Sequence, residues 1–288
     1  AFPDTYAIGM SHLGLKILYH ILNLHQEVWA ERVFAPWPDC EALLRKQGRP
    51  LVTLESKTPL SKMDLVGFSL QYELGYTNVL TMLSLGGISL SAADRGEKDP
   101  LVMAGGVGAL VPAAMSEFVD FFVVGDGEDA IREVADFFLS VPPALPRREK
   151  LERLARQVTG IFVPALYRWQ EGAGGPAWEK IVPSAPDLPI KARVADLEQA
   201  PFPTAPVVPV SEVTHDRITL EIMRGCVHGC RFCQAGMVKR PLRWRKPEQL
   251  LAQAKESYLR TGLSEIGLTS LSSSDYPCLK ELMELLTR

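Results

Sequence analysis

Short apolar runs alternate with helical patterns along the first 140 residues of the chain. Each run is nearly continuous in apolar residues, which is typical of strands buried on both faces of a parallel sheet. The pattern predicts a flavodoxin-like, doubly wound α/β domain of about five strands over residues 1–145. The expected strands are residues 6–9, 29–35, 64–70, 100–104 and 121–124. The expected helices are residues 11–24, a helix that includes Cys40, and residues 77–85, 113–118 and 129–139.

The pattern changes after residue 145, where proline and glycine become frequent. A helix is expected at residues 149–157, and a glycine-rich turn at residues 171–175 between two aromatic segments suggests a hairpin. The prolines that follow favour an extended chain. We therefore expect residues 146–210 to be a connector that contains this hairpin.

Residues 211–288 have the order strand, loop, helix, strand, helix. The strands are expected at residues 218–222 and 265–269, the first helix at residues 247–260, and the last helix after Asp275. This order is that of the beginning of a (β/α) barrel. Because a complete barrel of this kind needs on the order of 200 residues, we expect residues 211–288 to form only its N-terminal part.

Three cysteines lie within eight positions in the loop after the first of these strands. Cys226, Cys230 and Cys233 have the spacing C-x3-C-x2-C. Three thiolates on one tight loop bind three irons of a cubane cluster and leave the fourth iron open for the amino and carboxylate groups of S-adenosylmethionine. A ferredoxin closes its cluster with a fourth cysteine, and the spacing C-x2-C-x2-C-x3-C-P of bacterial ferredoxins does not occur here.

Two alternatives for the cysteines stay open at this point. A structural zinc site needs four ligands, and only His228 and Cys278 would complete the set. A four-cysteine electron carrier is the other alternative. Cys40 and Cys278 fall in expected helices, where a free cysteine is typically a small buried hydrophobe.

The motif resembles the signature of the radical SAM superfamily. The wider stretch of residues 224–236, and the beginning of the chain at residues 2–14, look like an uncharacterised radical SAM family with an N-terminal B12-binding-like domain. The resemblance implies that Cys226, Cys230 and Cys233 bind a [4Fe-4S] cluster and that Phe232 lies beside the adenine of S-adenosylmethionine. The superfamily has a glycine-rich segment after the second strand. Residues 270–274 hold that place here and lack the glycines.

Motifs of cobalamin-binding domains occur only in part. His12 has no acidic residue two positions before it, so the motif that supplies the cobalt ligand fails, and His12 is expected to be an ordinary helix-start or core histidine. Gly105 and Gly106 match the motif that lets the nucleotide tail approach the backbone. Residues 125–128 resemble an acidic turn of the family. Two readings stay open: a domain kept only as a scaffold, and a domain that binds cobalamin without a histidine ligand.

The composition is that of an ordinary globular protein, with 47% hydrophobic residues, 23% charged residues and a net charge of −3. No segment approaches the roughly 20 apolar residues that span a bilayer, so we expect a cytoplasmic protein with no membrane partner. Residues 239–246 are strongly basic. They are expected to be a solvated loop or a surface for an anionic substrate or an electron donor such as flavodoxin or ferredoxin.

The sequence therefore predicts a radical SAM enzyme that reductively cleaves S-adenosylmethionine to generate a 5′-deoxyadenosyl radical. A cobalamin-dependent methyltransferase and a methylthiolation-type enzyme are the alternatives among enzymes. The substrate, whether RNA, protein or small molecule, cannot be read from these residues. Because most barrel strands are expected to lie outside residues 211–288, we expect these 288 residues alone to be inactive on substrate.

Overall fold

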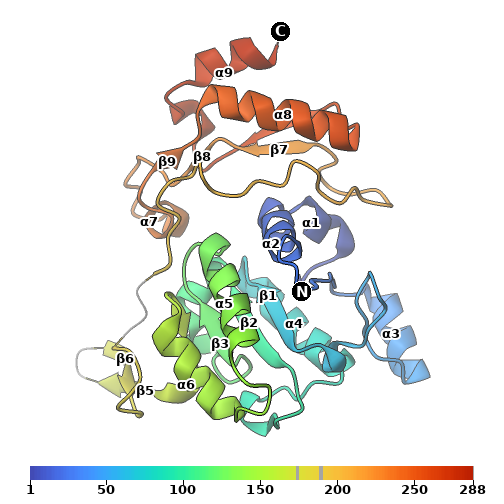
Figure 1. Cartoon of the computed structure of the whole chain (residues 1–288), viewed down its shortest axis with the longest axis vertical. Helices are drawn as coiled ribbons and strands as arrows, with labels where there is room; N and C mark the ends of the chain where they lie inside the picture. Colours follow the sequence, from blue (N-terminus) through green and yellow to red (C-terminus); the bar gives the residue numbers. More distant parts are fainter. Residues whose placement is uncertain (173–174, 188–190, 288) are drawn as a thin grey trace. The chain divides into compact units, whose positions relative to one another are not determined.

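The computed structural model describes residues 1–172, 175–187 and 191–287. The chain forms two compact units, which are both present in Figure 1. The N-terminal unit consists of Ala1–Gly9 and Leu22–Arg193, and the C-terminal unit of Met10–Ile21 and Val194–Arg288. Strands alternate with helices in both units, so the predicted α/β fold class is confirmed. No helix among the described residues is long and apolar enough to cross a membrane.

The apolar runs of the N-terminal unit form a four-stranded sheet in the order β1-β2-β3-β4. The first three strands are parallel, and β4 pairs antiparallel with β3. Val102, Phe121 and Phe122 have no solvent exposure, as expected for strands covered on both faces. The strands are β1 (Leu65–Ser69), β2 (Leu101–Gly105), β3 (Phe121–Val123) and β4 (Ile161–Phe162).

Two extended segments continue this sheet beyond β1. The Ser69 N–H donates to the Ala1 carbonyl oxygen at 3.1 Å, so the start of the chain lies alongside β1. Phe2 in turn forms a parallel bridge with Phe34, and its N–H donates to the Val33 carbonyl oxygen at 3.0 Å. The lateral order is therefore Phe34, Phe2, β1, β2, β3, which is the 2-1-3-4-5 order of flavodoxin-like sheets. The order reverses between Phe2 and β1, and this position is the switch point of the sheet.

The expected strand at residues 6–9 is wrong, because these residues begin the helix α1 (Tyr6–Ser11). A short apolar run has the same pattern in a buried helix turn as in a strand. Gly9 packs so closely on Phe34 that a Cβ would lie 2.2 Å from the aromatic ring. The expected strand at residues 29–35 is confirmed only as the single bridge at Phe34.

Most expected helices of the N-terminal unit are confirmed. Leu83 on α4 and Val134 on α5 are fully buried, as expected for helices with one apolar face. The expected helix at residues 113–118 is wrong: Pro112–Met115 is a 3₁₀ turn. The helices are α3 (Pro38–Gln47), α4 (Tyr76–Leu85), α5 (Glu128–Ser140) and α6 (Arg147–Gln157). Cys40 was expected to be buried and is exposed, because α3 has no buried residue.

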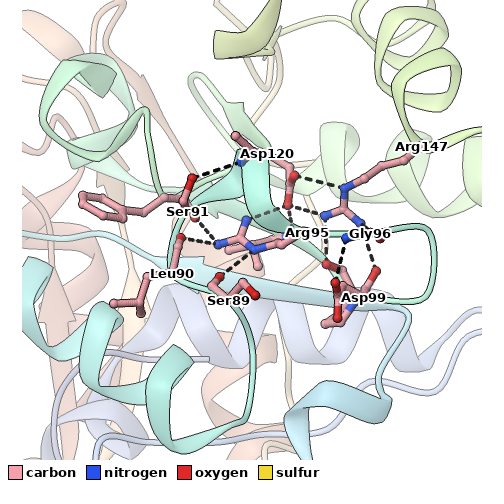
Figure 2. A network of polar contacts seen from close by, with 12 residues as sticks. Ser89, Leu90, Ser91, Arg95, Gly96, Asp99, Asp120 and Arg147 are labelled. Carbon is pink, nitrogen blue, oxygen red and sulfur yellow. Dashed lines mark hydrogen bonds and ion pairs between the residues drawn. The ribbon is translucent and has the colours of Figure 1, made fainter.

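A buried carboxylate joins two arginines in the N-terminal unit (Figure 2). Asp120 Oδ2 accepts hydrogen bonds from Arg95 Nη1 at 2.9 Å and Arg147 Nη2 at 2.8 Å. The same oxygen accepts from the Val102 N–H at 2.7 Å. Arg95 also donates to the carbonyl oxygens of Leu90 and Phe118. The network thereby connects β2, the residue before β3, and the first residue of α6.

The predicted hairpin is confirmed by two antiparallel strands, β5 (Tyr167–Gly172) and β6 (Gly175–Lys180). The rings of Trp169 and Trp178 pack edge to face, with centroids 5.0 Å apart. Residues 173 and 174 of the expected turn lie outside the described residues. After the hairpin, Ala192 forms a parallel bridge with Gly125 at the end of β3.

Residues 211–288 of the C-terminal unit have the expected order of strand, loop, helix, strand and helix, and the loop contains three short elements of its own. β7 and β10 are parallel neighbours, with Ile218 opposite Ile266 and Glu221 opposite Thr269. Leu220 on β7, Leu250 on α8 and Leu282 on α9 are fully buried and belong to the core between the two strands and these two helices. The elements are most of α2 (Leu13–Asn23, whose last two residues belong to the N-terminal unit), β7 (Ile218–Glu221), β8 (Met223–Arg224), α7 (Gln234–Val238), β9 (Arg243–Trp244), α8 (Pro247–Thr261), β10 (Ile266–Thr269) and α9 (Leu279–Leu286).

The connector after residue 193 packs within the C-terminal unit. Val194 and Leu197 are buried, and the buried Arg243 side chain donates to the Val194 carbonyl oxygen. Arg245, with no exposure, donates to the Ala200 carbonyl oxygen at 3.3 Å. Two arginines of the basic run are therefore buried, and the run is not simply a solvated loop.

Candidate functional site

The three cysteines lie in one loop that is closed at its base. β8 pairs antiparallel with β9, so Arg224 stands opposite Arg243 where the loop begins and ends. Gly225 has φ +96°, and a Cβ there would lie 2.8 Å from the Pro241 carbonyl oxygen. Only glycine fits this turn without strain. The sequence from Gly225 to Leu242 is thereby held as a compact loop, which we call the cysteine loop.

Two of the three thiols accept backbone hydrogen bonds. The His228 N–H donates to Cys226 Sγ, and the Gly236 N–H donates to Cys233 Sγ, both at 3.4 Å. Cys226 and Cys233 are half-buried and Cys230 is exposed, and none of them forms a disulfide. Hydrogen bonds to a cysteine sulfur tune the reduction potential of an iron–sulfur cluster that the sulfur binds.

The donor set fits a cluster better than a single zinc ion. Zinc needs four donors about 2.0–2.3 Å from one point. Among the described residues, no three Cys, His, Asp or Glu side chains converge on one point. The two further candidate ligands have other contacts: His228 Nε2 is hydrogen-bonded to Asp275 Oδ2 at 2.7 Å, and Cys278 packs against the apolar core of its unit. A cubane takes one thiolate per iron, so its ligands need not converge on one point.

The tip of the cysteine loop contacts the segment after β10. Asp275 accepts hydrogen bonds from Ser272 and from His228, and these bonds lower the pKa of its carboxyl group. The Ser270 and Ser273 hydroxyls lie 2.9 Å apart in the same segment. Hydrogen bonds between its own side chains therefore hold the segment of residues 270–275 in place.

Phe232 precedes the third cysteine and is 92% exposed. An exposed aromatic ring offers a face on which a base can stack. Its role beside the adenine of S-adenosylmethionine stays a prediction.

Glu221 was missed by the sequence analysis. It ends β7, and its carboxylate binds the Arg224 guanidinium through two hydrogen bonds of 2.8 and 2.9 Å. The Glu221 side chain is 14% exposed and the Arg224 side chain 10% exposed. Their two parallel hydrogen bonds fix the Arg224 guanidinium just before the cysteine loop. A glutamate ending a strand with an arginine three residues later was the only signal for this pair.

His12 has the structural role that the failed cobalt motif suggests. Its Nδ1 accepts a hydrogen bond from the Leu15 N–H at 3.1 Å, at the start of α2. The prediction of a helix-start histidine is therefore confirmed.

The glycines considered for cobalamin lie at the carboxyl ends of β2 and β3. At two of them a Cβ would clash with the backbone of another segment of the chain. Gly106 has φ +95°, and a Cβ there would lie 2.5 Å from the Leu70 carbonyl oxygen. Gly125 has φ +119°, and a Cβ would lie 2.1 Å from the Ala192 carbonyl oxygen. Gly105 is different, because its nearest neighbour, Val123, would be 3.9 Å from an added Cβ. The role of Gly105 and Gly106 toward a cofactor stays a prediction.

Two solved structures with a similar fold are of one enzyme. One is described as the radical S-adenosylmethionine methyltransferase TsrM of Kitasatospora setae with cobalamin and [4Fe-4S] cluster bound. It has a TM-score of 0.56 and 14% identity, over 98% of this chain and 49% of that one. A second structure of TsrM, with tryptophan substrate and the analogue aza-SAM bound, has a TM-score of 0.52, with the same identity and coverage.

One curated relative and two family models match the sequence. The uncharacterized protein MJ0966 of Methanocaldococcus jannaschii is 22% identical over 300 residues, which cover 99% of this chain and 51% of that protein. The chain thus spans about half the length of the curated relative it matches. The family model "Radical SAM superfamily" matches residues 220–288, and the model "Radical SAM proteins, N-terminal" matches residues 14–164. Since the latter alone covers more than half of the 288 residues, the chain belongs to the radical SAM proteins.

Proposed function

We propose that Cys226, Cys230 and Cys233 hold a [4Fe-4S] cluster and that the protein reductively cleaves S-adenosylmethionine. The observation that carries this proposal is the closed cysteine loop, with three free thiols, two of which accept backbone N–H groups. When bound, such a cluster supplies the electron that breaks the sulfonium C–S bond and yields a 5′-deoxyadenosyl radical.

The residues of this chain have distinct tasks in the proposal. The three thiolates bind iron, and two of them, Cys226 and Cys233, accept hydrogen bonds from the N–H groups of His228 and Gly236. The bidentate contact with Glu221 holds Arg224 at the entrance of the loop. Phe232 offers its exposed ring to the adenine. A flavodoxin or ferredoxin is the proposed electron donor, and the exposed Arg240 and Lys246 would attract its acidic surface.

Anaerobic reconstitution with iron and sulfide tests the proposal. We expect about four irons per chain and a brown chromophore, with 5′-deoxyadenosine formed after reductant and S-adenosylmethionine are added. Replacing any one of the three loop cysteines by alanine should abolish the cluster. The matched variants Cys40→Ala and Cys278→Ala should retain it. Tight binding of one zinc with no uptake of iron would refute the proposal.

Methyl transfer through cobalamin is the second candidate. The observation that favours it is the flavodoxin-like strand order, whose carboxyl edge is where open α/β sheets bind ligands, together with the fold shared with TsrM. Titration with hydroxocobalamin, followed by absorbance, tests it. Binding should be unaffected by His12→Ala, because His12 caps α2, and should be lost with Gly105→Leu. Absence of binding to the folded protein at its natural length would favour the scaffold reading.

A further inference from the structure

His228 connects three parts of the candidate site. Its N–H donates to Cys226 Sγ at 3.4 Å, and its carbonyl oxygen accepts from Arg240 Nη2 at 3.2 Å. Its imidazole Nε2 lies 2.7 Å from Asp275 Oδ2. Asp275 also accepts a hydrogen bond from the Ser272 hydroxyl. A single residue therefore links a cysteine of the loop to the segment that follows β10.

The two linked segments leave the same edge of the sheet. β7 and β10 are parallel neighbours, with Glu221 opposite Thr269 at their carboxyl ends. Loops at the carboxyl ends of adjacent parallel strands bind ligands between them. A small molecule on the open iron of a three-cysteine cluster would therefore meet residues 270–275 beside it. The contact between His228 and Asp275 sets how far these residues stand from the cysteine loop.

We propose that His228 and Asp275 form a positioning pair that holds residues 270–275 against the cysteine loop and thereby sets the fit of S-adenosylmethionine at the cluster. This inference rests on the proposed function. The side chains are 56% and 31% exposed, so the pair acts through geometry rather than as a strong buried ion pair. Neither residue needs to touch the cofactor in this role.

A double-mutant cycle on the reconstituted protein at its natural length tests the pair. S-adenosylmethionine binding is measured by equilibrium dialysis with the oxidised cluster, so that no turnover occurs. We expect His228→Ala and Asp275→Ala each to weaken binding about tenfold, and the double variant to weaken it no further. His228→Gln, which keeps a side-chain N–H donor, should restore most of the affinity. His215→Ala removes an exposed histidine outside the loop and is the matched control.

The cluster itself is the internal reference. Iron content should stay at about four per chain in every variant, while the EPR spectrum of the reduced cluster should lose part of its response to S-adenosylmethionine in the alanine variants.

If wild-type protein takes up no cluster, the proposed function fails. If it binds cluster and cofactor but both alanine variants behave like wild type, only the pair is refuted. Weakening by Asp275→Ala alone would mean that Asp275 meets the cofactor directly. Iron loss in His228→Ala would assign His228 to cluster assembly. Either result overturns the pair.

Discussion

Replacing Asp120 by alanine should destabilise the N-terminal unit more than any surface change. Asp120 is 3% exposed and accepts from Arg95, which has no exposure, and from Arg147, which is 11% exposed (Figure 2). Burial lowers the pKa of Arg95, and the Asp120 charge opposes that shift. An arginine stays charged in a protein, so the variant leaves a buried cation that has lost its carboxylate.

The magnitude follows from the contacts that are lost. Removing one partner of a buried ion pair costs about 3–5 kcal/mol. The Val102 N–H, which donates to the same carboxylate at 2.7 Å, loses its partner as well, and this alone costs about 1–3 kcal/mol. These costs overlap, because one oxygen accepts most of the bonds. We expect Asp120→Ala to lower the free energy of unfolding by about 3–5 kcal/mol, a large share of the 5–15 kcal/mol typical of a domain.

Urea unfolding followed by tryptophan fluorescence measures this loss. Trp244 is in the C-terminal unit, and the other four of the five tryptophans are in the N-terminal unit, so the signal reports mainly on the unit that contains Asp120. Arg148→Ala is the matched control, because its side chain is 79% exposed and pairs with Glu152 on the same helix. That variant should change stability by less than about 0.5 kcal/mol. A loss below about 1 kcal/mol in Asp120→Ala would refute the reasoning.

Three further changes test local features. Gly106→Ala should lower the urea midpoint of the N-terminal unit markedly, because its Cβ would lie 2.5 Å from a backbone oxygen at φ +95°, whereas Gly105→Ala should have little effect. Gly225→Ala should reduce iron uptake on reconstitution, and Gly229→Ala, whose Cβ would have no neighbour closer than 4.0 Å, should not. Burial lowers the pKa of His20 below 6.5, so on acidification the unfolded chain binds the proton before the folded chain does. The stability of the C-terminal unit, which contains His20, should therefore fall below pH 6.5. The replacement His20→Gln should remove that part of the pH dependence in urea midpoints.

The parallel sheet could be predicted because its central strands are nearly continuous apolar runs. The bounds of β1, β2 and β3 agree with the expected residues 64–70, 100–104 and 121–124 to within one residue at each end. The first strand was misplaced, because Ala1 and Phe2 pair beside β1 with too few residues to form a pattern. A four-residue apolar run such as 6–9 does not distinguish a strand from a helix turn. The central parallel strands of the flavodoxin-like domain therefore followed from the sequence, and its first strand did not.

The cysteine loop could be predicted from spacing, but its supports could not. Cys226, Cys230 and Cys233 are close in sequence, so the loop that carries them is local. The contact between His228 and Asp275 joins positions 47 residues apart, and no local pattern reports such a pair. The buried Arg243 is a second case, since its partner Val194 is 49 residues away in the connector. A run of basic residues predicts solvent exposure only when nothing distant binds its members.

The glycines of the N-terminal unit give the narrowest test of what that unit does. A glycine at a strand end allows a cofactor to approach, but it equally allows the chain to approach itself. Gly106 faces the Leu70 carbonyl oxygen and Gly125 faces Ala192, so neither needs a cofactor to explain it. Gly105 has no such neighbour, because a Cβ there would lie 3.9 Å from Val123, at ordinary contact distance. Cobalamin binding by the wild-type protein separates the two readings. If the sheet edge holds the cofactor, Gly105→Leu should abolish that binding; if the domain is a scaffold, neither the wild type nor the variant should bind cobalamin.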